Sequence, residues 1–125
     1  MNSAVKTILI ADDDEDLRLL VQVTLENPTY RILTAVDGHQ ALAAVRQSQP
    51  DLLILDWMMP GLTGCEVTTQ LRQNPETVAM PVIMLTAKEG VDAREQMSSL
   101  ALAGYLVKPF SPLELIKKVR EALDS

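Results

Sequence analysis

The sequence has few aromatic residues, one cysteine and no long apolar run. Aromatic residues make up 3% of the 125 residues, so the core must be built from aliphatic side chains. A single cysteine, Cys65, excludes an internal disulfide and fits a reducing compartment. No run approaches the roughly 18 apolar residues of a membrane span, and the first residues lack the basic and apolar stretches of a signal peptide. We therefore expect a cytoplasmic protein without a membrane association.

Positive charge is also scarce. There are 11 lysine and arginine residues against 17 acidic ones, giving a formal net charge of −6. Binding to nucleic acids depends on clustered lysine and arginine, so direct contact with nucleic acid is not expected. An acidic surface favours a metal ion, a cationic ligand or a basic partner instead. The length and the 47% hydrophobic content indicate one globular domain over residues 1–125, ordered over about 5–123.

Short apolar runs alternate with longer amphipathic segments along the chain. The runs cover residues 7–11, 31–35, 52–55, 82–85 and 105–107. The first, third and fourth contain no charged residue, as expected of parallel strands covered on both faces. The second and fifth carry Arg31, Thr34 and Tyr105, which places them at the sheet edges. The pattern predicts an α/β fold with a five-stranded parallel sheet and helices on both faces.

The segments between the runs have patterns typical of five helices. Thr63 with Glu66 and Ser111 with Glu114 each form a predicted capping box, and Asp37 is a predicted N-cap. The inward stripe predicted for the first helix consists of Leu17, Leu20, Val21 and Leu25. The predicted fourth helix, about residues 89 to 100, has the weakest apolar stripe, which favours a loosely held element.

Polar side chains follow four of the predicted strands. Asp12 and Asp13 follow the first, Asp56 the third, Thr86 the fourth and Lys108 the fifth. The carboxyl ends of parallel strands meet at one edge of the sheet, where such folds bind ligands. Two like charges about 4 Å apart repel by roughly 4 kcal/mol at an effective dielectric of 20. A divalent cation with hard oxygen ligands, such as Mg²⁺, would relieve this repulsion.

Each of these residues also has an ordinary structural explanation. Acidic residues such as those at 12–16 are favoured at a helix N-terminus, and Asp56 could be a polar strand end entering a turn. Thr86 could be a β-branched strand residue and Lys108 a solvated cation. Their coincidence at one edge of the sheet favours a functional site.

Four ordered sequence strings carry a resemblance to a known family. They are ILIADD at 8–13, LDWMMPG at 55–61, PVIMLTA at 81–87 and YLVKPF at 105–110. Together they span nearly the whole chain, which resembles the CheY-like receiver domains of two-component response regulators. The resemblance implies a flavodoxin-like, doubly wound sheet of strand order 2-1-3-4-5.

The resemblance also implies a role for each acidic residue at the sheet edge. Asp56 is similar to the family's phosphorylated aspartate. Asp12 and Asp13 resemble the acidic pair that holds Mg²⁺ together with Asp56, and the backbone carbonyl of Met58 corresponds to a further ligand.

Other residues match the family's catalytic and switch positions. Thr86 and Lys108 resemble the hydroxyl and amine that engage the phosphoryl oxygens, so with Asp56 they form the implied catalytic set. Thr86 and Tyr105 resemble the switch pair, and Lys108–Pro109 resembles the family's cis peptide bond. Phosphorylation would switch the face formed by the fourth helix, fifth strand and fifth helix. A second receiver or an output domain could then bind to this face.

The implied function is phosphoryl acceptance. The donor would be a phosphohistidine on a histidine kinase or a histidine phosphotransfer domain. Such a protein catalyses only its own phosphorylation and dephosphorylation and is not otherwise an enzyme. Met58 cannot hydrogen-bond an attacking water and Lys88 could shield the phosphoryl group, so a slowly decaying phosphoprotein is expected.

Three other functions remain open at this point. A haloacid-dehalogenase-like phosphatase has an Asp-x-Asp pair, but the residue two past Asp56 is Met58. A flavodoxin-type flavin binder needs a phosphate loop where this chain has acidic residues at 12–16. An unphosphorylated pseudo-receiver that acts as a protein-binding scaffold is the third alternative, and the presence of all five site residues argues against it.

Overall fold

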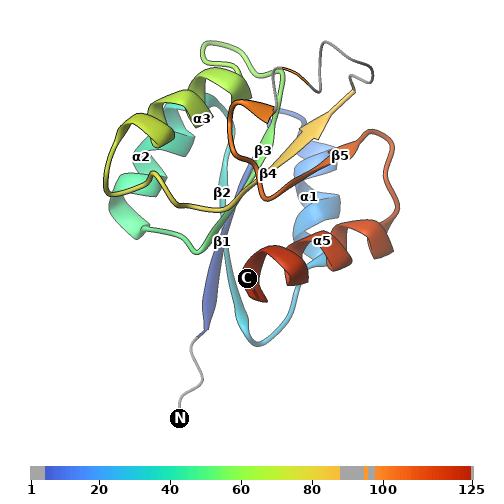
Figure 1. Ribbon diagram of the computed structural model, residues 1–125. Coiled ribbons are helices and arrows are strands. Elements are labelled where there is room, and N and C mark those ends of the chain that lie inside the picture. The colour runs from blue at the N-terminus through green and yellow to red at the C-terminus, as the bar shows by residue number, and fades with distance from the viewer. Residues whose placement is uncertain (1–4, 88–94, 96–97, 125) are drawn as a thin grey trace.

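The computed structural model describes residues 5–87, 95 and 98–124, and five parallel strands in it form one sheet (Figure 1). The strands are β1 (Lys6–Ala11), β2 (Tyr30–Ala35), β3 (Leu52–Asp56), β4 (Val82–Thr86) and β5 (Gly104–Val107). Their order is β2-β1-β3-β4-β5. The predicted sheet, its order and the edge positions of β2 and β5 are confirmed.

Helices cover both faces of the sheet. They are α1 (Glu15–Thr24), α2 (Gly38–Ser48), α3 (Gly64–Gln73) and α5 (Pro112–Asp124). In Figure 1, α2 and α3 lie on one side of the sheet and α1 and α5 on the other. The sequence predicts five helices, and four are counted over the described residues, because the predicted fourth helix lies largely outside them. Among the helices of the described ranges, none has the length and apolar composition needed to cross a membrane.

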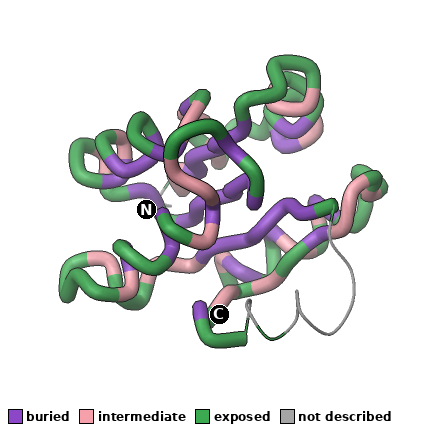
Figure 2. The backbone as a smooth tube through the Cα atoms, turned by 90° about the horizontal axis from the view of Figure 1, so that it is seen from above, coloured by how far each residue is buried: buried purple, intermediate pink, exposed green. Residues whose placement is uncertain are grey.

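The three central strands are buried on both faces, as the uninterrupted apolar runs predict (Figure 2). Side chains alternate along each strand. One set contacts α2 and α3 and includes Leu9, Leu53, Leu55 and Met84. The other contacts α1 and α5 and includes Ile8, Ile10, Ile54 and Leu85. The result is a rigid aliphatic centre whose strand ends carry polar residues.

Both predicted capping boxes are present. The Thr63 hydroxyl accepts from the Glu66 amide, and the Glu66 carboxylate accepts from the Thr63 amide. Ser111 and Glu114 exchange the same pair of hydrogen bonds, each 3.1 Å long. These boxes hold the starts of α3 and α5 beside the carboxyl ends of the strands.

The inward stripe predicted for α1 is wrong at one position. Val21 and Leu25 are buried, but Leu20 is 51% exposed. Each residue turns an α-helix by about 100°, so Leu20 lies a quarter turn away from Val21. The helix packs on the sheet along a narrower stripe than the apolar pattern indicates.

Gly64, the first residue of α3, packs directly against the end of β3. Its amide donates to the Trp57 carbonyl over 2.7 Å. A Cβ at position 64 would overlap the Asp56 carbonyl oxygen and lie 2.9 Å from the Met84 sulfur. The sequence pattern marks this residue only as the one that follows the Thr63 cap.

We expect Gly64→Ala to lower the free energy of unfolding by about 2 to 3 kcal/mol, because the added methyl group overpacks rigid backbone. Urea denaturation followed by circular dichroism measures the change. Gly104→Ala is the matched control, since its Cβ would meet only the Lys118 side chain, at 3.4 Å. Equal stability of the two variants would contradict the expectation.

Candidate functional site

The polar residues that follow the strands lie together at the carboxyl edge of the sheet. β1 and β3 are neighbours, and Ala11 pairs with Leu55, so Asp12 and Asp56 come next to each other. One carboxylate oxygen from each of Asp12, Asp13 and Asp56 lies within 4.8 Å of the other two. Asp12 is fully buried, Asp56 is 5% exposed and Asp13 is exposed.

Lys108 connects the two buried carboxylates. Its Nζ lies 3.0 Å from Asp56 Oδ1 and 3.7 Å from Asp12 Oδ2. The first contact is a charge-assisted hydrogen bond, and the second is an ion pair beyond hydrogen-bond range. The Lys108 amide also donates to the Thr86 carbonyl over 2.7 Å, and the Lys108–Pro109 peptide bond is cis.

The burial of these carboxylates makes them weaker acids. Desolvation is the main cause that raises the pKa of Asp12 to about 6, and the negative charge of Asp56 adds to it. The Asp14 amide, 2.9 Å from Asp12 Oδ1, and the Lys108 ammonium oppose this rise. Desolvation also raises the pKa of Asp56, against the hydrogen bonds from Lys108 and the Met58 amide. Added positive charge would therefore stabilise the ionised carboxylates of the site.

The acidic run at 12–16 divides between the two explanations that the sequence allows. Asp12 and Asp13 belong to the carboxylate cluster. Asp14 is the N-cap of α1, accepting from the amides of Asp16 and Leu17, and the next two acidic residues lie in the first turn. The cap position of Asp14 is not predicted from the sequence, and neither is the contact of Arg18, whose Nη1 donates to the Asp12 carbonyl over 2.8 Å. The position of Asp14, three residues before the apolar Leu17, is the sequence feature that could have indicated the cap.

The remaining predicted residues surround this cluster. Thr86 is fully buried at the end of β4, and Met58, two residues after the end of β3, is 61% exposed. Tyr105 on β5 is 37% exposed, so its ring lies at the surface. Lys88 lies outside the described residues. The structure thus brings Asp12, Asp13, Asp56 and Lys108 into contact range, with Thr86 at the adjacent strand end.

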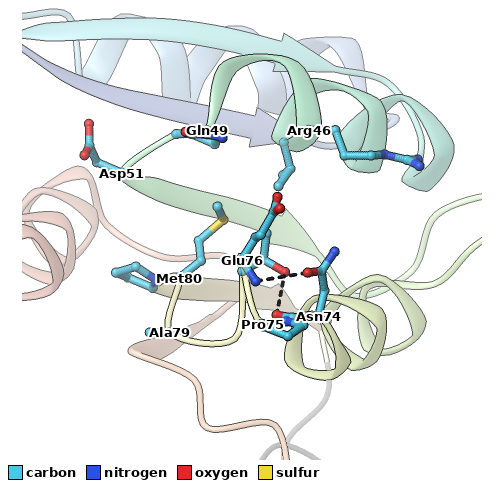
Figure 3. A pocket seen from close by; sticks show the side chains of 12 residues that line it. Arg46, Gln49, Asp51, Asn74, Pro75, Glu76, Ala79 and Met80 are labelled. Carbon is cyan, nitrogen blue, oxygen red and sulfur yellow. Dashed lines mark hydrogen bonds between the residues drawn. The ribbon is translucent and has the colours of Figure 1, made fainter.

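The donor set fits a hard divalent cation. Asp12 Oδ2 is buried and has no hydrogen-bond partner among the described residues. An unsatisfied buried carboxylate oxygen is costly, and beside two further carboxylates it is a suitable Mg²⁺ ligand. A separate hollow of about 600 Å³ lies at the opposite end of the sheet, near the ends of α2 and α3 (Figure 3).

Comparison with known proteins agrees with this arrangement. The family model of the response regulator receiver domain matches residues 8–120. The structure resembles the chemotaxis protein CheY4 of Vibrio cholerae with a TM-score of 0.89 and 32% identity, over 96% of this chain and 100% of that one. A Francisella response regulator receiver domain matches with a TM-score of 0.87 and 30% identity, over 95% and 97% of the two chains.

A parallel α/β fold with an acidic cluster and a lysine at its carboxyl edge defines the CheY-like class. This chain belongs to the response regulator receiver domain family. Among curated proteins, it is 42% identical over 118 residues to the phosphate regulon transcriptional regulatory protein PhoB of Pseudomonas aeruginosa, covering 94% of this chain and 52% of that protein. It is 41% identical over 118 residues to the alkaline phosphatase synthesis transcriptional regulatory protein PhoP of Bacillus subtilis, covering 94% and 48%. The chain spans about half the length of these relatives.

Stability without metal is expected to fall as the pH rises through the acidic range. The raised pKa of Asp12 means that the folded protein holds a proton that the unfolded chain has lost, between the ordinary value of 3.8 and about 6. Mg²⁺ competes with this proton, so it should raise the melting temperature more at pH 7.5 than at pH 5. A concentration of 100 times the Kd should give a rise of about 10 °C at the higher pH.

Thermal unfolding followed by circular dichroism measures both effects. Asp12→Asn should remove most of the Mg²⁺ effect, whereas Asp51→Asn, at the other end of the sheet, should keep it. Equal Mg²⁺ shifts at the two pH values would count against the assignment of the site.

Proposed function

We propose that this receiver accepts a phosphoryl group on Asp56 from the phosphohistidine of a histidine kinase or a histidine phosphotransfer domain. The observation that carries the proposal is the position of Asp56, hydrogen-bonded to Lys108 at 3.0 Å and clustered with Asp12 and Asp13. Family membership favours this function over the phosphatase and flavin-binding alternatives. The presence of the three carboxylates and the lysine at one site argues against an unphosphorylated scaffold.

In the proposed transfer, a carboxylate oxygen of Asp56 attacks the phosphorus atom. The bond between phosphorus and the donor's histidine nitrogen breaks, and its electron pair remains on that nitrogen. The product is an acyl phosphate, which water can hydrolyse. Phosphoryl transfer depends on positioning and charge neutralisation rather than on acid–base catalysis. The protein would catalyse only its own phosphorylation and dephosphorylation.

The carboxylates of Asp12, Asp13 and Asp56 and the backbone carbonyl of Met58 are the proposed Mg²⁺ ligands. When bound, Mg²⁺ lowers the repulsion between the Asp56 carboxylate and the incoming anionic group. Asp12 Oδ2, buried and without a hydrogen-bond partner among the described residues, gives the clearest reason for a cation here.

Lys108 is proposed to neutralise charge on the transferred group. Its ammonium donates to Asp56 Oδ1, and its side chain is 26% exposed, so the ammonium can contact both the carboxylate and an added phosphoryl oxygen. Such preorganised charge stabilises the transfer because little reorganisation is needed. The Thr86 hydroxyl at the end of β4 is the proposed partner of a second phosphoryl oxygen.

The proposed output is a change in the surface around β5. Thr86 pairs with Val107, and Met84 pairs with Tyr105, so movement at the end of β4 reaches β5 directly. Displacement of Thr86 toward the phosphoryl group would leave room for Tyr105 to turn inward. β5 and α5 would then form part of a face for a second receiver or an output domain; the predicted fourth helix of that face is largely outside the described residues.

We further propose that the domain acts in the cytoplasm and does not itself contact nucleic acid. The acidic charge of −6 supports the second statement. PhoB and PhoP are named transcriptional regulatory proteins and are about twice as long as this chain. Any control of transcription would therefore act through a part or partner beyond the receiver.

Incubation with Mg²⁺ and acetyl phosphate should add the mass of one phosphoryl group to the wild-type chain and none to Asp56→Asn. Intact mass spectrometry measures the product. Asp51→Asn is the matched control, because its carboxylate lies at the opposite end of the sheet and accepts the Thr7 amide hydrogen. Hydrogen exchange on the same samples should change in β5 and α5 only when Asp56 is phosphorylated.

Phosphorylation of Asp56→Asn to the wild-type level would reject the acceptor. Absence of phosphorylation in the wild type, with both the small donor and a kinase, would favour the scaffold alternative.

Met58→Asn should accelerate loss of the phosphoryl group, because the amide can hold an attacking water that the thioether cannot. Met58 is 61% exposed and lies two residues after the end of β3, so the replacement should fold normally. We expect an increase of about tenfold in the decay rate, which is below the roughly 10²- to 10⁴-fold effect of a positioned general acid or base, because the amide only orients the water. Timed mass spectra measure the decay. Met58→Leu, which lacks the amide, is the control, and identical decay of all three proteins would contradict the prediction.

A further inference from the structure

A hollow of about 600 Å³ lies at the end of the sheet opposite the carboxylate cluster (Figure 3). It is bounded by the last turn of α2, the end of α3 and the segments that lead into β3 and β4. Its walls include Val45, Pro50, Met80 and Pro81. We call it the α2–α3 hollow. Its volume is within the usual range of ligand sites, and it combines apolar walls with a few polar groups.

The charged side chains around the α2–α3 hollow point in different directions. In Figure 3 the Glu76 carboxylate points into it, toward α2, whereas the Arg46 guanidinium points away. Arg46 Nε donates to the Leu42 carbonyl of its own helix, at 3.4 Å. Asp51 also points away from the hollow in the figure, and its Oδ2 accepts from the Thr7 amide over 2.8 Å. Over the described ranges, Glu76 forms no ion pair.

Two helix ends add to the negative potential. α2 ends at Ser48 and α3 at Gln73, and both C-terminal ends border the hollow. The last carbonyl groups of a helix carry partial negative charge, which favours a cation, and an arginine in the last turn of each helix, Arg46 and Arg72, offsets part of this charge. Asn74, the C-cap of α3, uses its side-chain oxygen to accept from the Glu76 amide over 3.0 Å. This bond holds the loop in the conformation that directs Glu76 inward.

We propose that the α2–α3 hollow binds an alkyl cation, meaning a guanidinium or ammonium group on an aliphatic stem. Glu76 and the two helix ends would face the charge, and Val45 and Met80 would contact the stem. The cation is either an arginine or lysine side chain of a partner protein or a free small amine. The site lies away from Asp56, so the inference goes beyond the proposed phosphorylation and does not depend on it.

The test is a titration of the ¹⁵N-labelled full chain, followed by the backbone amide shifts of Gln49, Asn74 and Glu76. N-acetylarginine amide is the first probe, and N-acetylcitrulline amide is its uncharged counterpart of nearly equal shape. We expect saturable shifts with a Kd of about 1 mM for the arginine probe. The citrulline probe should bind several-fold more weakly, because it lacks the charge that Glu76 faces.

Glu76→Gln should raise the Kd of the arginine probe about two- to fivefold, the effect of losing one solvent-exposed ion pair. Glu26→Gln removes an exposed carboxylate at the end of α1 and is the matched control, with no change expected. Asp56→Asn should bind the probe as the wild type does, so failure of the phosphorylation proposal would leave this result unaffected.

Butylguanidine, titrated in the same way, distinguishes the two sources of the cation, because it has the same single charge as the arginine probe but no peptide groups. Tighter binding of butylguanidine supports a free small cation, and tighter binding of N-acetylarginine amide supports a side chain of a partner protein. Absence of saturable shifts with both cations, equal binding of the citrulline probe, or an unchanged Kd in Glu76→Gln would each overturn the inference.

Discussion

The repulsion between buried carboxylates at the ends of β1 and β3 is the constraint on which the site depends. The pairing of Ala11 with Leu55 brings Asp12 and Asp56 together in a place that water reaches poorly. Among the residues that the structure describes, Lys108 supplies the one ammonium that contacts both, at 3.0 and 3.7 Å. A single positive charge leaves the described cluster net negative. Burial is the main cause that raises the pKa of both carboxyl groups, and the negative charge of the neighbouring carboxylates adds to it. A divalent cation would offset this cost, which supports the proposed binding of Mg²⁺ together with a transferred phosphoryl group.

Such a cluster requires a rigid support. The central strands are buried on both faces by aliphatic side chains, and these strands position Asp12, Asp56 and Thr86. The start of α3 contacts the end of β3 so closely that position 64 has no room for a Cβ. The free energy of burying the aliphatic core therefore offsets the cost of holding like charges together. Exposed residues around this rigid centre, such as Met58 and Tyr105, remain free to contact water or partners.

The two ends of the sheet have different chemistry for the same topological reason. The carboxyl ends of the parallel strands meet at the edge that holds the carboxylates and Lys108. At the other end, α2 and α3 finish near the segments entering β3 and β4, so helix carbonyls and Glu76 surround the α2–α3 hollow. One end therefore concentrates the carboxylates and the lysine proposed to bind Mg²⁺ and a phosphoryl group, and the other holds the proposed site for an organic cation.

The apolar runs determined the strands, because a strand buried on both faces must be apolar without interruption. The capping boxes determined where α3 and α5 begin, and the strand-end residues indicated the position of the candidate site. The position after β1 indicated Asp12 and Asp13 as site residues, but local patterns did not show that Asp12 is buried while Asp13 is exposed, or that Asp14 caps α1. Nor could they show that Leu20 is exposed, that Asp12 Oδ2 lacks a hydrogen-bond partner among the described residues, or that Glu76 points into a hollow. These features depend on helix rotation and strand register, which are set by packing between segments distant in the chain.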